Sequence, residues 1–318
     1  MLRDVAFAKR GEPQPQAYAI LALGRVGDRE SLDELSKMLG SSGTRAILRR
    51  AAATAIAAIA EPEDWKAQAA LMEASRNDPD LPTRDAAILG LGEIRHGRVA
   101  RHLLKLFHES VDTARPTVAL ALGIQGDPKA APAIRKELAS TGDWRRRGAY
   151  SLSLGLLGDL ASAPMLEKEF HRCDIPEVKG RIALALALMG SVPSADLFYE
   201  AAGASDRPRL RVNLSVAMAL LGDRRGASVL TSMLTQDKSV AGRLSGAVTL
   251  GVLRWFEAAP KLVDAYRNPR NDPSVRVYAL VGLGILADPQ PVPKLARMAA
   301  DGHADQPLPS LREVLSIL

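Results

Sequence analysis

Eight basic side chains recur along this sequence at a nearly constant interval of 31 to 35 residues. Each stands at the expected start of a helix, where a cation opposes the helix dipole and needs a compensating partner. The expected partners are acidic residues of the preceding turn, such as Asp80, Asp143 and Asp272, or of a neighbouring repeat. Such a row forms either an Arg–Asp ladder between repeats or a series of anion-binding sites. This basic row consists of Arg49, Arg84, Arg115, Arg147, Lys179, Arg211, Arg243 and Arg276.

Other residues that could do chemistry are few. His96, His102 and His108 are spaced six apart, which does not place two of them on one helix face as metal ligands at i and i+4. The single cysteine, Cys173, excludes an internal disulfide, and only His171 stands near it as a base. Phosphate-binding loops, paired-cysteine motifs and G-x-S-x-G are absent from the sequence. We therefore predict no catalytic residue, no metal and no cofactor, and a protein that is not an enzyme.

The elements that position the basic row are helical repeats. A small anchor residue follows each basic position by eight residues, and in the first repeat Gln16 takes the basic position. A period of about 32 residues predicts an α-solenoid of about nine helical hairpins. The anchors are Gly24, Ala57, Gly92, Gly123, Gly155, Ala187, Ala219, Gly251 and Gly284.

Each repeat predicts two helices with a capped turn between them. In the last repeat, apolar residues at helical spacing run from Val277 to Leu286, and a second amphipathic segment begins at Pro291. Asp288 and Pro289 between them suit the N-cap and the first helical position. A small residue two positions before each anchor would let adjacent helix backbones approach closely. The same cap position holds Asp28, Asp127, Asp159, Ser191 and Asp223 in other repeats.

The motif D-P-x-V-R-x-x-A-x-x-x-L-G-x-x-x-D is nearly complete from Asp272 to Asp288. It resembles the HEAT-repeat family, and in particular the short repeats of phycobilisome-lyase-like proteins, over about residues 15–300. The resemblance implies an all-α, right-handed superhelix forming one domain over residues 1–318. It also implies that the Arg-led helices lie on the concave side and the Asp-capped helices on the convex side. We expect residues 304–318 to cap the last repeat.

Resemblance to the enzymes of this fold stops short of their active sites. Deoxyhypusine hydroxylase uses four His-Glu pairs for a di-iron site, whereas this chain has one such pair, His108-Glu109. HEAT-like DNA glycosylases use a basic concave face with exposed aromatic residues, which the apolar inner helices of this chain do not provide. Bilin lyase subunits have a similar repeat pattern, but no bilin-contacting residue is identified by a motif.

Uncharged inner helices in the second half of the chain mark one candidate binding surface. One position past the anchor, the residue is Leu156, Leu188, Leu220, Val252 and Ile285 in the last five repeats. We call these five residues the apolar row. Either they pack between successive helices of a tightly wound array, or they line an apolar groove for a partner helix, an extended peptide or the end of the chain itself. Full burial of the first four would exclude the groove.

Two further departures from the repeat pattern are candidate sites. His96 takes a cap position and is followed by the basic stripe, Arg98, Arg101, His102, Lys105 and His108, which is either a solvated helix face or a docking site for an acidic partner or phosphate. Trp255 takes another cap position beside Phe256. This aromatic turn is either a binding hot spot or part of the local core.

The composition sets broad limits on function. Lys and Arg number 42 against 36 acidic residues, so the net charge of +6 gives a mild attraction to anions. No run of 18 apolar residues is present, so we predict no transmembrane segment. The first residues are typical of the end of a helix followed by a Pro-rich turn, so we expect a chain trimmed upstream. Localisation stays unknown, with cytoplasmic as the default, because such trimming would remove an export signal.

These observations favour a non-catalytic scaffold or adaptor that binds a protein or peptide, most directly through the concave face. A second hypothesis is an enzyme or chaperone, bilin-lyase-like or other, that acts on an apolar ligand in the groove. A third is an anion or nucleic-acid binder that uses the basic row and the basic stripe, although nucleic acid is not the expected partner. The identity of the partner and the oligomeric state are not determined by the sequence.

Overall fold

The structure is a computed structural model, and it describes residues 1–8, 11–110 and 113–288. Within these ranges every regular element is a helix. The chain divides into two compact units, residues 1–139 (unit 1) and 140–318 (unit 2). The prediction of one domain over residues 1–318 is not tested by this division and stays a prediction, as does the handedness of the superhelix.

Unit 1 contains the first nine α-helices of the described chain. They are α1 (Leu2–Ala6), α2 (Pro13–Val26), α3 (Leu32–Gly40), α4 (Ala46–Ile59), α5 (Trp65–Asn77), α6 (Leu81–Glu93), α7 (Gly97–Glu109), α8 (Arg115–Gln125) and α9 (Ala131–Ser140). Unit 2 continues with α10 (Trp144–Leu156), α11 (Ala163–Arg172), α12 (Pro176–Leu188), α13 (Ser194–Ala204), α14 (Pro208–Leu220), α15 (Arg225–Gln236), α16 (Val240–Val252), α17 (Ala259–Arg267) and α18 (Pro273–Ala287).

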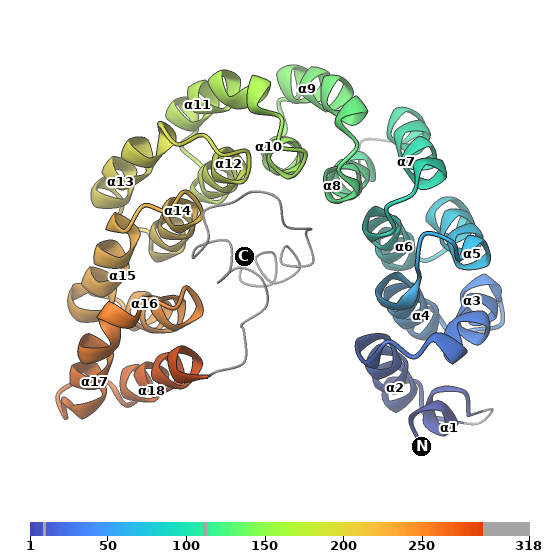
Figure 1. The fold of residues 1–318 in the computed structure, drawn as a ribbon, viewed down its shortest axis with the longest axis horizontal. Coiled ribbons are helices and arrows are strands. Elements are labelled where there is room, and N and C mark those ends of the chain that lie inside the picture. Colours follow the sequence, from blue (N-terminus) through green and yellow to red (C-terminus); the bar gives the residue numbers. More distant parts are fainter. Residues whose placement is uncertain (9–10, 111–112, 289–318) are drawn as a thin grey trace. The chain divides into compact units, whose positions relative to one another are not determined.

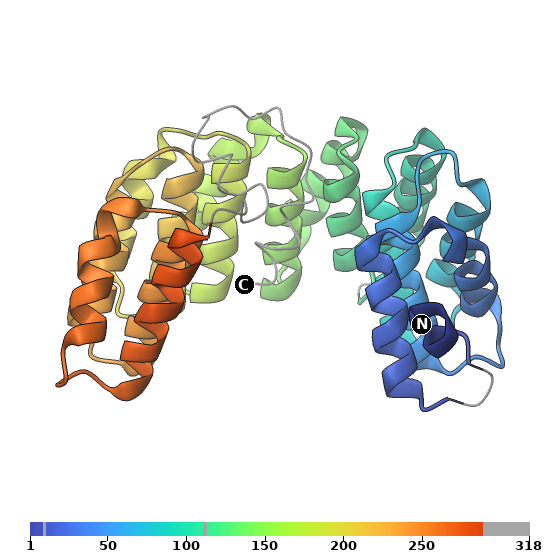
Figure 2. The same cartoon turned by 60° about the horizontal axis from the view of Figure 1, so that its bottom comes forward.

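Within each unit the helices form two layers, as Figures 1 and 2 show. Successive even-numbered helices pack side by side, α2 on α4 and α10 on α12 for example. Odd-numbered helices of the same unit pack against the even-numbered helix that follows, α5 on α6 and α17 on α18 for example. The prediction of an all-α solenoid built from helical hairpins is confirmed. The second helix expected after Asp288 and the predicted cap at residues 304–318 lie outside the described residues.

The anchor residues bring neighbouring even-numbered helices into backbone contact. A Cβ placed on Gly24 would lie 2.9 Å from the Cα of Ala55, and one on Gly155 only 2.5 Å from the Cα of Ala185. In both pairs the second residue is the small residue two positions before the next anchor. Glycine at the anchor lowers helix propensity by about 1 kcal/mol against alanine, and this close packing is the compensation.

Turns after the even-numbered helices also follow a rule that the sequence pattern alone did not indicate. In six of the nine repeats the residue three positions past the anchor adopts a positive φ, and in five of these it is glycine, at 27, 126, 158, 190 and 222. The exception is Arg254, whose φ of 52° is a conformation that L-residues adopt at a cost. The expected cap residues follow these turns, but after Asp28, Asp127, Asp159 and Trp255 the second helix begins with one turn of 3-10 helix.

Candidate functional site

The basic row lies near the N-terminal ends of the even-numbered helices, and most of its side chains reach backbone carbonyls at the ends of odd-numbered helices. Arg115 donates to Ser110 O at 2.8 Å, and Arg243 donates to Asp237 O at 2.8 Å. These carbonyls are the negative end of the preceding helix dipole, which favours a nearby cation. The conflict expected from the position of the row on its own helix is thereby relieved. Further bonds of this kind run from Arg49 to Thr44, Arg147 to Thr141 and Arg276 to Tyr266.

Several members of the row also bind a carboxylate from the second helix of their own hairpin. Arg49 holds Asp78 through two bonds, Nε–Oδ2 at 2.7 Å and Nη2–Oδ1 at 2.8 Å, and both side chains are buried. The other pairs are Arg115–Glu137 at 3.1 Å, Arg147–Glu169 at 3.4 Å and Arg211–Asp237 at 3.1 Å. These four positions therefore form ion pairs, but the pairs join the two helices of one hairpin and do not form the predicted ladder between repeats.

The predicted acidic partners were wrong. Asp80, Asp143 and Asp272 instead cap the helices they precede, accepting from the backbone N–H groups of Thr83, Arg145 and Ser274. A short carboxylate at an N-cap already lies beside its own helix amides, so these acids are engaged locally. Asp80 also pairs with Arg50, which is not a member of the row. The true acids lie 22 to 29 residues after their arginine, a spacing that only the hairpin geometry explains.

At two positions a residue other than arginine contacts the end of the preceding element. Gln16, the substitute in the first repeat, donates from Nε2 to Ala8 O at 2.6 Å. Lys179 lies over the ring of Phe170 at 4.8 Å from its centroid, a cation–π contact with the preceding odd-numbered helix. Both reach the end of the preceding element, as their neighbours in the row do.

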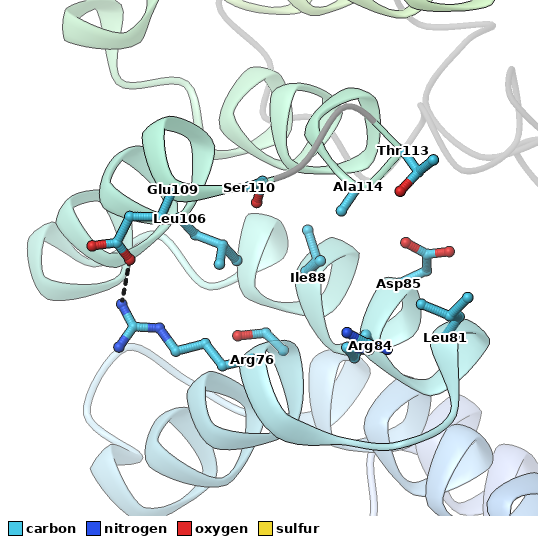
Figure 3. Close-up of a pocket in the computed structure, with 11 residues that line it drawn as sticks. Arg76, Leu81, Arg84, Asp85, Ile88, Leu106, Glu109, Ser110, Thr113 and Ala114 are labelled. Carbon is cyan, nitrogen blue, oxygen red and sulfur yellow. Dashed lines mark ion pairs between the residues drawn. The ribbon is translucent and has the colours of Figure 1, made fainter.

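Arg84 is the exception within the described part of the chain. Its Nε is buried and has no hydrogen-bond partner, and no ion pair or ring contact involves this side chain. It lines a cavity of about 390 Å³ within unit 1, whose described lining comes from the end of α5, the first half of α6, the end of α7, Thr113 and Ala114. Figure 3 shows Arg84 and Asp85 on one wall and the Arg76–Glu109 ion pair, 3.7 Å long, across the space.

The apolar row is partly accessible. Leu188, Leu220, Val252 and Ile285 are neither fully buried nor fully exposed, so the condition that would exclude the groove is not met. The middles of two of these helices are buried, over residues 182–187 of α12 and 212–219 of α14. On α12 and α14 the accessible part of the inner face is therefore the last turn. On α18 it extends to Leu280 and Val281, 44% and 42% exposed, which the sequence pattern did not single out.

Leu156 departs from its predicted place in the row. Its side chain is only 6% exposed. The reason is local packing, because every residue of α10 from Gly148 to Leu156 is buried. Leu156 belongs to the hydrophobic core of unit 2, and the exposed part of the row begins at Leu188.

The two residues of the aromatic turn have different environments. Trp255 is half-buried, and its ring lies against α15, where a Cβ on Gly226 would stand 2.9 Å from Cη2 of the ring. Phe256 is 59% exposed. The strained backbone of Arg254 immediately precedes them. Trp255 is thus packed as local core, and Phe256 alone is available to a partner.

The basic stripe lies on α7, but His102 does not share its exposed face. Arg98, Arg101, Lys105 and His108 are exposed, and Lys105 pairs with Glu109 at 3.6 Å. His102 instead contacts Ser75 Oγ of α5 through Nε2 at 3.0 Å. Burial and the neighbouring charge of Arg76 lower the pKa of His102 to about 4, so its ring is neutral at pH 7. His96 caps α7, its Nδ1 accepting from the N–H of Arg98 at 3.2 Å.

The depressed pKa of His102 predicts a pH-dependent stability. Because the folded pKa, about 4, lies below the usual histidine pKa of 6.5, the unfolded chain binds the proton more readily. The stabilising contribution is complete above pH 6.5 and is lost as the pH falls toward 4. After allowing for partial solvent screening, we expect His102→Gln to reduce the loss of unfolding free energy between pH 7 and pH 4 by ~1–2 kcal/mol.

Urea titrations of the wild type and His102→Gln at a series of pH values measure this effect. His108→Gln, which changes an exposed histidine of the same helix, is the matched control and should follow the wild-type profile. Identical pH profiles for wild type and His102→Gln would show that His102 does not carry the effect.

No group of three or more His, Cys, Asp or Glu side chains that could hold a metal ion occurs among the described residues. Cys173 is buried, and its Sγ lies 3.5 Å from Ile175 O. None of the described helices is both long and apolar enough to cross a membrane.

The chain was compared with protein families, solved structures and curated proteins. A family model of HEAT repeats matches residues 5–80 and 68–155. Among solved structures, human deoxyhypusine hydroxylase in complex with glycerol is similar at 17% identity and a TM-score of 0.38, covering 83% of this chain and 99% of that one. The CpcE–CpcF complex of phycocyanin lyase from Nostoc has 18% identity and a TM-score of 0.41, covering 89% and 91%. Among curated proteins, none matches the sequence significantly.

Proposed function

Because this chain is a HEAT-repeat protein, we propose that it is a non-catalytic scaffold that binds another protein or a peptide through the apolar row of unit 2. The observation that carries the proposal is the shared position of Leu188, Leu220, Val252 and Ile285. Each is the residue after the anchor, in the last turn of an even-numbered helix, and each is partly exposed.

The four residues come from four successive even-numbered helices, α12, α14, α16 and α18, each of which packs against the next. With helix axes 8–10 Å apart, the line they form spans roughly 24–30 Å. An amphipathic helix of about 20 residues covers that distance, and so does an extended segment of about nine residues. The apolar character of the line favours a partner segment with leucine or aromatic side chains at matching intervals.

The surroundings of the row carry little charge that would compete with an apolar partner. In α14 and α16, no residue from seven positions before the anchor to two positions after it is charged. The nearest charges before these ranges are the basic-row residues Arg211 and Arg243. In α12 the one exception, Arg181, is half-buried, and its Cδ packs against Gly148 at 3.0 Å from where a Cβ would stand. An acidic substitution in the row would therefore place an unpaired charge in an apolar contact.

We predict that Leu188→Glu combined with Leu220→Glu weakens partner binding at least about tenfold, the effect of burying an unpaired carboxylate. Full-length protein immobilised on resin would first recover partners from a cell extract. The affinity of a purified partner for wild type and variant would then be measured by calorimetry.

Leu160→Glu is the matched control, because Leu160 lies in the 3-10 turn before α11 and is 57% exposed outside the row. It should bind the partner as the wild type does. Circular dichroism should show the same helix content for all three proteins. A partner retained with unchanged affinity by Leu188→Glu/Leu220→Glu would exclude the row as the binding surface.

A further inference from the structure

We propose that the cavity around Arg84 in unit 1 is a binding site for a carboxylate attached to an apolar group. The site is separate from the apolar row, which lies in unit 2, and it is independent of the scaffold function proposed above. Its walls are the ends of α5 and α7, the first half of α6 and residues 113 and 114 before α8, and its volume of about 390 Å³ is within the range of small-ligand pockets.

The first argument is the unfilled position in a repeated pattern. Every other arginine of the basic row has an oxygen partner, and in four hairpins that partner includes a carboxylate. Arg84 has neither. The Nε of Arg211 is likewise unpaired, but its Nη1 binds Asp237 at 3.1 Å. An arginine with a buried, unsatisfied Nε is costly to retain unless a ligand satisfies it.

Second, among the described residues, two carboxylates at the ends of the odd-numbered helices on either side of Arg84 are held by other groups. Asp78, at the end of the preceding odd-numbered helix, holds both Nε and Nη2 of Arg49 and accepts the N–H of Asp80. Glu109, at the end of α7, pairs with Arg76 at 3.7 Å and with Lys105 at 3.6 Å. Arg84 lines the cavity with its buried Nε unsatisfied, and Figure 3 shows its place among the lining residues.

The third argument concerns the kind of anion. A carboxylate matches the guanidinium geometry and is the group that the equivalent arginines bind elsewhere in the chain. Asp85 also lines the cavity, and its negative charge disfavours a dianionic phosphate more than a single carboxylate. Leu81, Ile88 and Leu106 contribute apolar walls. The ligand is accordingly a monocarboxylate with an apolar body, either a free acid or a glutamate side chain flanked by apolar residues in a peptide.

The test is a titration of full-length protein with four probes, namely hexanoate, hexanamide, inorganic phosphate and a capped Leu-Glu-Leu peptide. Binding is followed by the side-chain Nε–Hε resonance of Arg84 in NMR spectra, assigned by its loss in Arg84→Gln. We expect hexanoate or the peptide to shift this resonance, whereas hexanamide and phosphate do not. Tighter binding of the peptide identifies a protein source for the carboxylate, and tighter binding of hexanoate identifies a free acid.

Arg84→Gln should weaken binding of the carboxylate probe at least about tenfold, as expected for the loss of a charge-assisted hydrogen bond. Arg45→Gln, which removes an exposed cation of the same unit outside the cavity, should bind like the wild type. Because Arg84 has no partner to lose, its replacement should leave the unfolding temperature unchanged or raise it. Equal carboxylate binding by wild type and Arg84→Gln, the absence of binding by any carboxylate probe, or a clear drop in the unfolding temperature of Arg84→Gln would each overturn the proposal.

Discussion

Replacing Arg49 by methionine is expected to lower the free energy of unfolding by about 3–5 kcal/mol, the cost of leaving one partner of a buried ion pair uncompensated. Asp78, whose side chain is 4% exposed, would retain a buried charge without its two guanidinium bonds. The carbonyl of Thr44 would lose its donor as well. Chemical denaturation followed by circular dichroism at pH 7 measures the difference.

Arg50→Met is the matched control, since it removes the adjacent cation from the same helix. Arg50 pairs with Asp80 at 3.1 Å, but its side chain is 45% exposed. An exposed pair of this kind contributes less than about 1 kcal/mol. The double variant Arg49→Met/Asp78→Asn should recover part of the loss, because it removes the unpaired charge and keeps an acceptor for the N–H of Asp80. Equal effects of Arg49→Met and Arg50→Met would contradict the structural role assigned to the buried pair.

The pH dependence of the Arg49 effect follows from Asp78. Burial raises the pKa of this carboxyl, but the bonds from Arg49 and from the N–H of Asp80 lower it by more, so the pKa lies below the usual aspartate value of 3.8. The stability from this pair is present above pH 3.8 and is lost as the pH falls through the lower folded value. The difference between wild type and Arg49→Met should therefore narrow in acid.

The periodicity of the sequence predicts the fold well because each repeat position has a local task. The anchors, the small residues two positions before them and the cap residues all act within one helix or between adjacent helices, so their spacing is visible in the chain. Asp127, for example, caps its turn by accepting the N–H of Lys129. The period also locates the basic row, although not the atoms that each member contacts.

Partners across a hairpin could not be predicted in the same way. Asp80 is the nearest acid before Arg84 in sequence, yet it caps its own helix. Asp78 binds Arg49 from 29 residues away. Which acid reaches which arginine depends on where the odd-numbered helix ends, and that end varies by several residues between repeats. The cavity at Arg84 arises from such a variation, because Glu109 is held by Arg76 and Lys105.

The repeat pattern of the sequence also does not predict how deeply individual side chains are buried. Leu156 and Leu188 hold the same position in successive repeats, but only Leu188 is accessible. His102 follows Arg101 directly, and one residue of helical rotation, about 100°, carries its ring from the exposed face to the contact with Ser75. For a side chain at the border between two helix faces, the degree of burial is set by the packing of the neighbouring helix and not by its own position in the helix.

The second large effect is expected at an anchor. Gly155→Ala should lower the free energy of unfolding by about 2–3 kcal/mol through overpacking. The new Cβ would lie 2.5 Å from the Cα and 2.7 Å from the carbonyl oxygen of Ala185, so α10 and α12 would have to separate. Backbone atoms cannot rotate away as a long side chain could, and the strain would therefore spread along both helices. Thermal and chemical unfolding of the purified variant measure the loss.

Gly203→Ala provides the control, because Gly203 is exposed in α13 and a Cβ there would meet no atom within 4 Å. This substitution should be neutral or stabilising by up to about 1 kcal/mol, the gain in helix propensity from glycine to alanine. The two variants make the same chemical change, so the difference between them isolates the helix contact. If Gly155→Ala has the same free energy of unfolding as the wild type and Gly203→Ala, the two even-numbered helices are not in backbone contact at this anchor. A loss confined to Gly155→Ala, partly recovered by adding Ala185→Gly, would show that close helix packing is what the repeated glycine provides.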